Sequence, residues 1–299
     1  MTTSFDAHST AAQVLAGVDL SGRTAVVTGG YSGVGREAAL ALAGAGAYVI
    51  VPARRPEVAR QALRDGRIDI RPMDLADLTS VEKTAGEILA DRPAVDIVIG
   101  SAAVMACPET RVGPGWEAQF AINHLGHYAL VAGLWPALQA AGAARVVMVA
   151  SGRSPEDRMR WDDVHFTRGY DKWAAYGQSK LATVLFAHHL DKLGMLAFSA
   201  SPGWVLSPLQ RHLAQTEMIE AGWIDADGAP APGLFRSAAQ GAATPVWAAT
   251  SPAAEPFGGS YCRDCAATET YPTDGPEGER LWDLSAELTG LDPRQSTTR

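Results

Sequence analysis

The sequence predicts an α/β fold in which a doubly wound parallel sheet of six to seven strands is flanked by helices. Three observations carry this prediction. Short apolar runs alternate with stretches of helical composition, and a glycine-rich loop joins the first run to the first helix. In addition, 47% of the 299 residues are hydrophobic, which is enough to build one large core.

The first strand-helix-strand unit begins at Thr24. There the apolar run TAVVT is followed by the loop GGYSGVG, the alanine-rich helix REAALALAGAG and the run YVIV, and this second strand is expected to end near Val51. Each later apolar run predicts one further strand. These runs are IDIR, VDIVIG, ARVVMVA and MLAFSAS.

We expect one domain over residues 1–299, with residues 1–20 as an N-terminal extension. The segment at about 207–234 follows the sixth predicted strand. Because the carboxyl ends of parallel strands place ligands, this segment is predicted to be a substrate lid. No role at the site is expected for the C-terminal segment from about 266 to 299, where SAELTG indicates a short surface helix and QSTTR a frayed tail.

Charge and composition exclude several kinds of partner. The formal net charge is −8 and there is no block of basic residues, so nucleic acid is not expected to bind. The sequence predicts neither a membrane span nor a secretory signal, and hence a cytoplasmic protein. Cys262 and Cys265 form a CxxC without a second ligand pair, so no metal site is predicted and the pair is expected at a strand end and turn.

The glycine loop at 28–35 has the spacing TGxxxGxG between a predicted strand and a predicted helix. Glycines in this position let the backbone approach a pyrophosphate, whose charge is met by amide N–H groups and the positive end of the helix dipole. The loop therefore predicts a Rossmann-type dinucleotide site. The cofactor-binding residues expected in it are Gly29, Tyr31, Ser32, Gly33, Val34 and Gly35.

The end of the second strand indicates which dinucleotide binds. An NAD-specific site offers an acid to the ribose 2′-hydroxyl there, but the sequence reads PARR and carries Ala53 and Arg54. Arg54, helped by Arg55 or Arg36, is expected to pair with a 2′-phosphate. NADP(H) is therefore predicted to be preferred over NAD(H).

Tyr176 and Lys180 lie four residues apart in the run WAAYGQSK, which is predicted to be helical. Residues at this spacing share one helix face, so a phenol lies beside an ammonium group. A neighbouring cation favours the phenolate and brings the phenol closer to a pKa that is useful at neutral pH. The pair therefore predicts a proton-transfer site.

Six motifs, taken together and in this order, resemble the short-chain dehydrogenase/reductase family. They are TGGYSGVG, the DL of Asp74 and Leu75, NHLGH, VVMVAS, YGQSK and SPGWVLS. The long gap between Ser151 and Tyr176 and the wording NHLGH and YGQSKLA resemble the branch that includes retinol dehydrogenases and protochlorophyllide reductase. The resemblance implies a nicotinamide cofactor, a small-molecule substrate and, in many members, a homodimer or homotetramer.

The resemblance also implies a catalytic tetrad of Asn123, Ser151, Tyr176 and Lys180. In this reading Asn123 holds a water chain to the lysine, and Ser151 hydrogen-bonds the substrate oxygen. Tyr176 gives its proton to a carbonyl oxygen, while Lys180 lowers the pKa of the phenol and holds the ribose.

Further cofactor contacts are implied in the same way. Asp74 and Leu75 are expected at the adenine ring, and the turn of Pro202, Gly203 and Val205 is expected at the carboxamide. Ser207 is expected at the pyrophosphate. The family's NNAG is here GSAA, residues 100–103, so contact at Ala102 is expected through the backbone, and the loss of the asparagine side chains is expected to loosen the central sheet.

These observations predict an NADP(H)-dependent ketoreductase or alcohol dehydrogenase acting on a moderately apolar small molecule. Reduction of an activated C=C bond is one alternative, suggested by the resemblance to protochlorophyllide reductase. A non-redox or cofactor-bound role, motivated by GSAA, is another. Trp204 is expected to narrow the pocket, and some aromatic residues before Tyr176 are expected to line it. The candidates are Trp161, His165, Phe166, Tyr170 and Trp173.

Overall fold

The computed structural model of the chain describes residues 5–152, 158–268 and 275–298. Its main sheet has eight strands in the order β10-β9-β8-β7-β4-β1-β2-β3. Every neighbouring pair is parallel except β9 and β10. The predicted doubly wound parallel sheet is confirmed, and a short antiparallel strand is added at one edge. The strands are β1 Thr24–Thr28, β2 Tyr48–Ala53, β3 Ile68–Pro72, β4 Ile97–Gly100, β7 Arg145–Val149, β8 Ala197–Ala200, β9 Tyr261–Arg263 and β10 Ala266–Thr268, and a separate hairpin is made by β5 Arg111–Val112 and β6 Trp116–Glu117.

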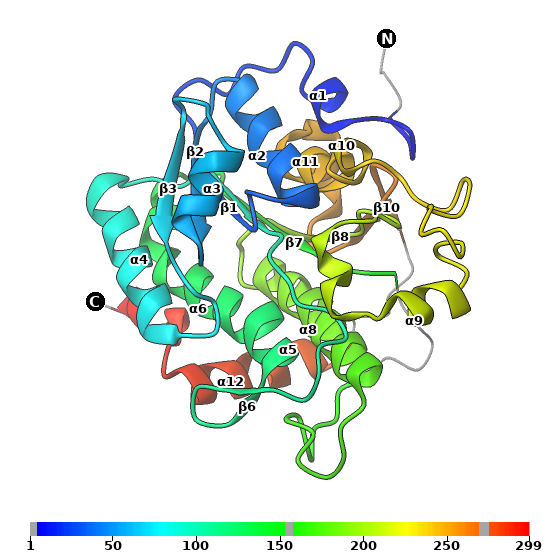
Figure 1. Cartoon of the computed structure of the whole chain (residues 1–299). Helices are drawn as coiled ribbons and strands as arrows, with labels where there is room; N and C mark the ends of the chain where they lie inside the picture. The colour runs from blue at the N-terminus through cyan, green and yellow to red at the C-terminus, as the bar shows by residue number, and fades with distance from the viewer. Residues whose placement is uncertain (1–4, 153–157, 269–274, 299) are drawn as a thin grey trace.

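Helices cover both faces of the sheet (Figure 1). One layer contains α1 Ala11–Val14, α2 Gly33–Gly44, α3 Pro56–Ala62, α10 Ala238–Gly241 and α11 Ala243–Thr250. The other contains α4 Leu78–Asp91, α5 Ala118–Phe120, α6 Gly126–Gly133, α7 Trp135–Ala140, α8 Lys172–Lys192 and α12 Glu277–Thr289. A π-helical turn, η1 Ala121–Leu125, joins α5 to α6, and 3₁₀ turns lie at η2 Pro208–His212, η3 Pro252–Phe257 and η4 Pro293–Thr298.

The strands divide the apolar residues between two cores, because successive side chains point to opposite faces. In β1, Val26 packs with the layer of α4, α6, α8 and α12, whereas Ala25 and Val27 pack with the layer of α1, α2 and α11. All five residues of β1 and of β7 are buried. This two-sided burial explains why the strands read as continuous apolar runs rather than alternating ones.

The strand order places a topological switch point between β1 and β4. From β1 the chain winds outward to β2 and β3, and then crosses back to β4 on the other side of β1. In such sheets ligands bind in the crevice beyond the carboxyl ends of the strands at the switch point. The glycine loop follows β1 and the GSAA segment follows β4, so both lie at this position.

Strand β2 runs two residues beyond the predicted end at Val51 and includes Pro52. A proline inside a sheet removes a backbone donor and is normally unfavourable. Pairing with β1 extends only to Ile50, whereas pairing with β3 continues to Ala53. Pro52 therefore lies where β2 has one neighbouring strand, which is the situation that tolerates proline.

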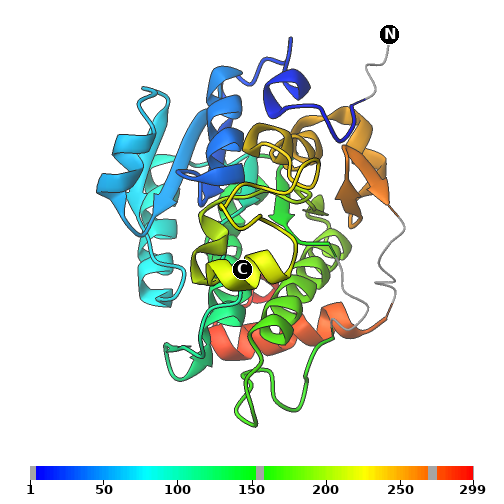
Figure 2. The same cartoon turned by 45° about the vertical axis from the view of Figure 1, so that its right-hand side comes forward.

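The 207–234 segment contains η2 and the short helix α9 Gln215–Glu220. Leu213 and Met218 of this segment pack against Met105 and Ala106, which follow β4. An ion pair between Lys172 and Glu217 joins α9 to the first turn of α8, and Figure 2 shows the yellow-green segment beside that helix. The 207–234 segment is therefore held at two places, against the residues that follow β4 and against the first turn of α8.

The expectation for the C-terminal segment was wrong. In place of a short surface helix, α12 spans thirteen residues and buries Leu281 and Trp282 in the core formed with α4, α6 and α8. The Trp282 indole is 2% exposed, and its ring centroid lies 5.1 Å from that of Tyr128 and 6.0 Å from that of Phe186. The C-terminal segment thus completes one of the two cores.

Replacing Trp282 with alanine is expected to lower the free energy of unfolding by about 3–5 kcal/mol, because a buried indole is lost and its cavity remains. Urea denaturation measures the change. Glu287→Ala, on the exposed side of the same helix, serves as the control and is expected to stay within about 0.5 kcal/mol of the parent. A loss below about 1 kcal/mol for Trp282→Ala would contradict the packing described here.

The CxxC lies at the sheet edge as expected, with Cys262 in β9 and Cys265 in the turn before β10. Burial raises the pKa of Cys262 to about 12 and that of Cys265 to about 11, so both thiols are protonated at neutral pH. Within the described residues no cluster of three or more His, Cys, Asp or Glu side chains could hold a metal ion. No helix in the same part of the chain is long and apolar enough to cross a membrane.

Candidate active site

A cavity of about 1070 Å³ opens at the carboxyl ends of the central strands. Ligand pockets for one small molecule usually measure about 300–1,000 Å³, so this cavity has room for a dinucleotide and a second molecule. Of the catalytic and cofactor-binding residues predicted from the sequence, Asn123 and the possible helper Arg36 do not line it. The others do: Gly29, Tyr31, Ser32, Gly33, Val34, Gly35, Arg54, Asp74, Leu75, Ala102, Ser151, Tyr176, Lys180, Pro202, Gly203, Val205 and Ser207.

The glycine loop forms a backbone cradle at the start of α2. Gly29 and Gly33 have φ of +64° and +52°, and a Cβ added to Gly29 would lie 2.9 Å from the backbone of Ala102. A Cβ added to Gly35 would lie 2.5 Å from the carbonyl oxygen of Gly29. Ser32 makes no side-chain cap, and the first turn of α2 contains no acidic residue. The helix end thus keeps donors and positive potential for an anion, which fits a pyrophosphate.

Tyr176 and Lys180 lie one turn apart on α8, as predicted. The ammonium nitrogen of Lys180 is 5.9 Å from the centre of the Tyr176 ring and donates a hydrogen bond of 2.8 Å to the carbonyl oxygen of Val149, at the end of β7. The Lys180 side chain is buried, and this burial lowers its pKa to about 8. Ser151 lies two residues beyond Val149, so the strand end brings Ser151 and Lys180 to the same wall.

Lys180→Met is expected to change how stability depends on pH. The folded pKa of about 8 lies below the unfolded value of about 10.4. Between these two pKa values the unfolded chain therefore binds more protons than the folded chain. The stability that Lys180 contributes rises with pH across this range and is lost as pH falls through about 8. The unfolding free energy of wild type minus that of Lys180→Met is expected to grow by roughly 2–3 kcal/mol between about pH 7 and pH 10. Urea denaturation across this range measures it, and a constant difference would contradict a depressed lysine.

Asn123 lies in the π-helical turn η1 and is 2% exposed. Its amide oxygen accepts from the backbone N–H of Val104, and its amide nitrogen donates to the carbonyl oxygen of Val104 and to the hydroxyl of Ser179. Ser179 in turn donates to the carbonyl oxygen of Tyr176. Asn123 therefore fastens the segment after β4 to the part of α8 that carries Tyr176, and it does so from behind the cavity wall.

The GSAA segment after β4 lacks the asparagines of the family pattern, and other side chains make its hydrogen bonds to the central sheet. The Thr28 hydroxyl accepts from the backbone N–H groups of Ser101 and Ala102. With both acceptor positions used, it donates to Nε2 of His127, 2.8 Å away. His127 then carries its proton on Nδ1, which donates to the carbonyl oxygen of Asn123. Burial lowers the pKa of His127 to about 4, and the ring is neutral at pH 7.

Thr28 joins the end of β1 to the exit of β4, which opposes the loosening expected from the missing asparagines; that loosening stays a prediction. A second amide supports the same exit. Gln119 accepts from the N–H of Ala106 and donates to the carbonyl oxygen of Lys172. The Thr28 hydroxyl therefore holds two of the residues that replace NNAG, and two buried amides hold the residues that follow them.

Three arginines line the part of the cavity that lies beside the end of β2. Arg54 and Arg55 follow β2, and Arg211 comes from η2 in the 207–234 segment. Burial and the positive charges of Arg54 and Arg55 lower the pKa of Arg211. Arg36 is engaged elsewhere, since it pairs with Glu37 at 2.8 Å. In the part of the chain that the structure describes, no acidic side chain forms an ion pair with the three lining arginines, which makes them a subsite for an anion.

Asp74 and Leu75, which are predicted to lie at the adenine ring, follow β3 and line the cavity. The Asp74 carboxylate accepts from the backbone N–H of Ala76, while Asp77 caps α4. In the turn after β8, Val205 pairs with Arg236 and Ser207 caps η2. These contacts fix the segment after β3 and the segment after β8, and both segments border the cavity.

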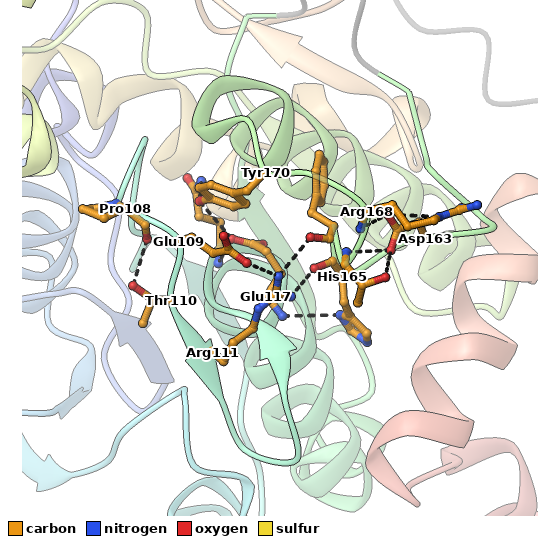
Figure 3. A network of polar contacts seen from close by, with 12 residues as sticks. Pro108, Glu109, Thr110, Arg111, Glu117, Asp163, His165, Arg168 and Tyr170 are labelled. Carbon is orange, nitrogen blue, oxygen red and sulfur yellow. Dashed lines mark hydrogen bonds and ion pairs between the residues drawn. The ribbon is translucent and has the colours of Figure 1, made fainter.

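The aromatic residues before Tyr176 divide into two groups. Trp173 lines the cavity, but Trp161, His165, Phe166 and Tyr170 do not. Figure 3 shows His165 and Tyr170 in a polar network that also contains Arg111 and Glu117. There the Tyr170 hydroxyl accepts from Gln119 and donates to the carbonyl oxygen of Cys107, and Glu117 accepts from the backbone N–H groups of Gln119 and Phe120.

This network fixes the loop before α8. Arg111 donates to the carbonyl oxygens of His165 and Phe166 and pairs with Glu109. Burial raises the pKa of Glu117, because the carboxylate has little contact with water. Of the five candidates, Trp173 is thus the one that lines the cavity, whereas Trp161 contacts Glu277 and Arg280.

Sequence reasoning missed several residues that the structure brings to the site. Arg211 and Trp223 line the cavity from the 207–234 segment and Phe235 from the residue just after it, whereas Thr28 and His127 hold the strand ends. The signal for Thr28 was available, since it directly precedes the glycine loop. For Arg211 and Trp223 no local pattern points to a site, because their neighbours come from distant parts of the chain.

Comparison with known proteins gives consistent matches. The family model described as "short chain dehydrogenase" matches residues 23–217. A "Probable oxidoreductase" of Streptomyces lividans is 39% identical and covers 90% of this chain and 98% of its own. "Retinol dehydrogenase 14" of Mus musculus is 32% identical over 91% of this chain and 87% of its own. The crystal structure of an uncharacterized protein from Mycobacterium paratuberculosis has a TM-score of 0.74 and 29% identity, covering 95% of this chain and 98% of its own.

Proposed function

The chain belongs to the short-chain dehydrogenase family, and we propose that it is an NADP(H)-dependent oxidoreductase that interconverts a carbonyl and an alcohol on a moderately apolar small molecule. Members of the family bind a nicotinamide cofactor. One observation carries the proposal: Ser151, Tyr176 and Lys180 meet on the wall of the same cavity that the glycine cradle opens into. The proposed proton donor and the proposed dinucleotide site therefore open into the same cavity.

The bound cofactor supplies hydride to the substrate carbon. Tyr176 is the general acid, and its phenol proton passes to the carbonyl oxygen in reduction and returns in oxidation. The Ser151 hydroxyl donates a hydrogen bond to the same oxygen and orients it. Lys180 keeps positive charge beside the phenol and, because Val149 takes one of its three N–H groups, has donors left for ribose hydroxyls.

Asn123 is a positioning residue in this proposal. Its amide groups are used by Val104 and Ser179, so it acts through the placement of α8 rather than by touching substrate. The π-helical turn that carries it is a local irregularity of a kind that is frequent at functional sites.

The preference for NADP(H) rests on charge at the adenosine end. A 2′-phosphate is an anion, which the methyl group of Ala53 cannot neutralise and the Asp74 carboxylate would repel, whereas Arg54, Arg55 and Arg211 line the cavity with cations. Charge-assisted hydrogen bonds of this kind are about twice as strong as neutral ones. Since Arg211 belongs to the 207–234 segment, we propose that this segment is a lid that the phosphate helps to hold.

A screen of NADPH oxidation over ketones, aldehydes and enones tests the proposal. We expect NADPH to be consumed with a ketone or an aldehyde, and NADH to be used more slowly. The product formed from the enone separates carbonyl reduction from C=C reduction. NADPH that binds but is never oxidised over the whole panel would overturn the proposal in favour of a non-redox role.

A further inference from the structure

A row of aromatic rings extends from Tyr176 along one wall of the cavity. Trp173 lies beside Tyr176 with ring centroids 6.5 Å apart, and Trp223 follows at 6.2 Å from Trp173. Trp204 lies 5.3 Å from Trp223, and Phe235 lies 6.3 Å from Trp204. Each contact is edge-to-face, so the row continues without a gap through five rings that all line the cavity.

The rings of this row come from separate segments that the fold brings together. Trp173 lies in the first turn of α8, Trp204 in the turn after β8, and Trp223 after α9 in the 207–234 segment. The ion pair of Lys172 with Glu217 holds α9 against α8, and the packing of Met218 on Met105 holds α9 against the segment after β4. The row is therefore preorganised by contacts outside it.

The row also leaves apolar surface uncovered. Trp173 is 41% exposed and Trp204 is 51% exposed, which is unusual for neighbouring indoles. Contiguous apolar surface of this kind marks a place where a ligand or partner binds. Here it faces a cavity that also contains the proton donor, so a substrate is the occupant that fits.

Two charged groups that line the cavity, Asp171 and Arg160, have partners in the protein. The Asp171 carboxylate accepts from the backbone N–H groups of Trp173 and Ala174. The Arg160 guanidinium lies over the Phe166 ring at 4.6 Å and near the Asp163 carboxylate at 3.9 Å. An uncharged ligand therefore loses the fewest interactions on entering.

We infer that Trp173, Trp204, Trp223 and Phe235 form an aromatic subsite for a planar, unsaturated ring system attached to the reacting carbonyl or alcohol carbon. This inference rests on the proposed function. Edge-to-face rings offer negative faces and positive edges, which a planar ring complements by stacking or by edge contact, whereas a saturated ring of the same size gains only from burial. The substrate class is thus neutral aryl or polyunsaturated cyclic ketones and the corresponding secondary alcohols.

Calorimetric titration of the NADP⁺ complex, which cannot reduce a ketone, tests the subsite without turnover. The probes are the methyl ketone of naphthalene and its decahydro analogue, which share a skeleton and differ in unsaturation. We expect wild type to bind the naphthyl ketone about tenfold more tightly than the saturated one. Trp223→Leu is expected to weaken naphthyl binding about tenfold and to change binding of the decahydro ketone by less than about twofold.

Two further variants sharpen the test. Trp223→Phe keeps a ring and is expected to restore most of the preference, whereas Trp161→Leu, which removes an indole outside the cavity, is expected to leave both affinities unchanged. Equal weakening of both ketones by Trp223→Leu, or no wild-type preference, would overturn the subsite. If Trp223→Leu also fails to bind NADP⁺, the 207–234 segment has misfolded in that variant. The test then uses Trp173→Leu, which must weaken binding of the naphthyl ketone more than that of the decahydro ketone. An unsaturation preference without any NADPH turnover would overturn the proposed function and leave the subsite standing.

Discussion

Tyr176→Phe is expected to lower kcat for carbonyl reduction by roughly 10²–10⁴-fold, because positioned general acids contribute about this much. The variant removes one oxygen and keeps the ring that packs against Trp173. NADPH binding is expected to stay within about twofold, since the phenol is not needed for the phosphate contacts. Steady-state NADPH oxidation gives the rate, and fluorescence titration of NADPH gives the affinity.

Tyr48→Phe is the matched control for this substitution. Tyr48 lies at the start of β2, away from the cavity, and its replacement is expected to leave kcat unchanged. Full activity in Tyr176→Phe would refute the assigned proton donor. A parallel loss of NADPH affinity would instead indicate that the substitution disturbed the fold of the site.

The double variant Arg54→Ala/Arg211→Ala is expected to weaken NADPH binding by roughly 10²–10³-fold and to leave NADH binding within about threefold. The 2′-phosphate is the part of NADPH that NADH lacks, and each charge-assisted hydrogen bond contributes about 1.5–3 kcal/mol. Titration with both cofactors at constant salt measures the ratio. Raising the salt concentration is expected to weaken NADPH binding to wild type more than to the double variant.

Arg36→Ala is the control, because Arg36 already pairs with Glu37 and contacts the carbonyl oxygen of Ala62. It is expected to preserve the cofactor ratio. Should the double variant lose both cofactors equally, the arginines would serve the fold and not the phosphate. Tighter NADH than NADPH binding by wild type would reject the assigned cofactor preference altogether.

The sequence could predict the features whose signals are local. A strand, a glycine loop and a helix follow one another within residues 24–44, so the cradle for the pyrophosphate needed no knowledge of distant contacts. The spacing of Tyr176 and Lys180 likewise fixes one helix face. The order of the apolar runs predicted the parallel sheet, and the structure confirms this prediction.

Features that depend on contacts between distant residues could not be predicted. Ser285 and Thr289 are polar and read as surface positions, yet both are buried in α12. Ser285 is buried because its hydroxyl meets Nε2 of His124 at 2.7 Å, across 161 residues of chain. Polar residues therefore interrupt the buried face of α12, and the sequence alone does not show that these positions are buried. Their burial becomes clear only when the contact with His124 is known.

The same limit applies to the site. The sequence names Asn123 but not Val104 and Ser179, which use its amide group. It names Arg54 but not Arg211, because nothing in the run PLQRH marks an arginine that will lie beside the end of β2. Substituting GSAA for NNAG looked like a loss, since the compensating Thr28 hydroxyl acts through tertiary contacts.

Helix α12 has a consequence for how the protein is made. It follows in the chain every helix that it covers, so α6 and α8 leave the ribosome before Trp282 is synthesised. Until then the rings of Tyr128 and Phe186 are without their indole neighbour, and such exposed apolar surface is prone to aggregate during translation. A nascent chain that ends before α12 therefore leaves this apolar surface of α6 and α8 without the helix that covers it in the finished fold.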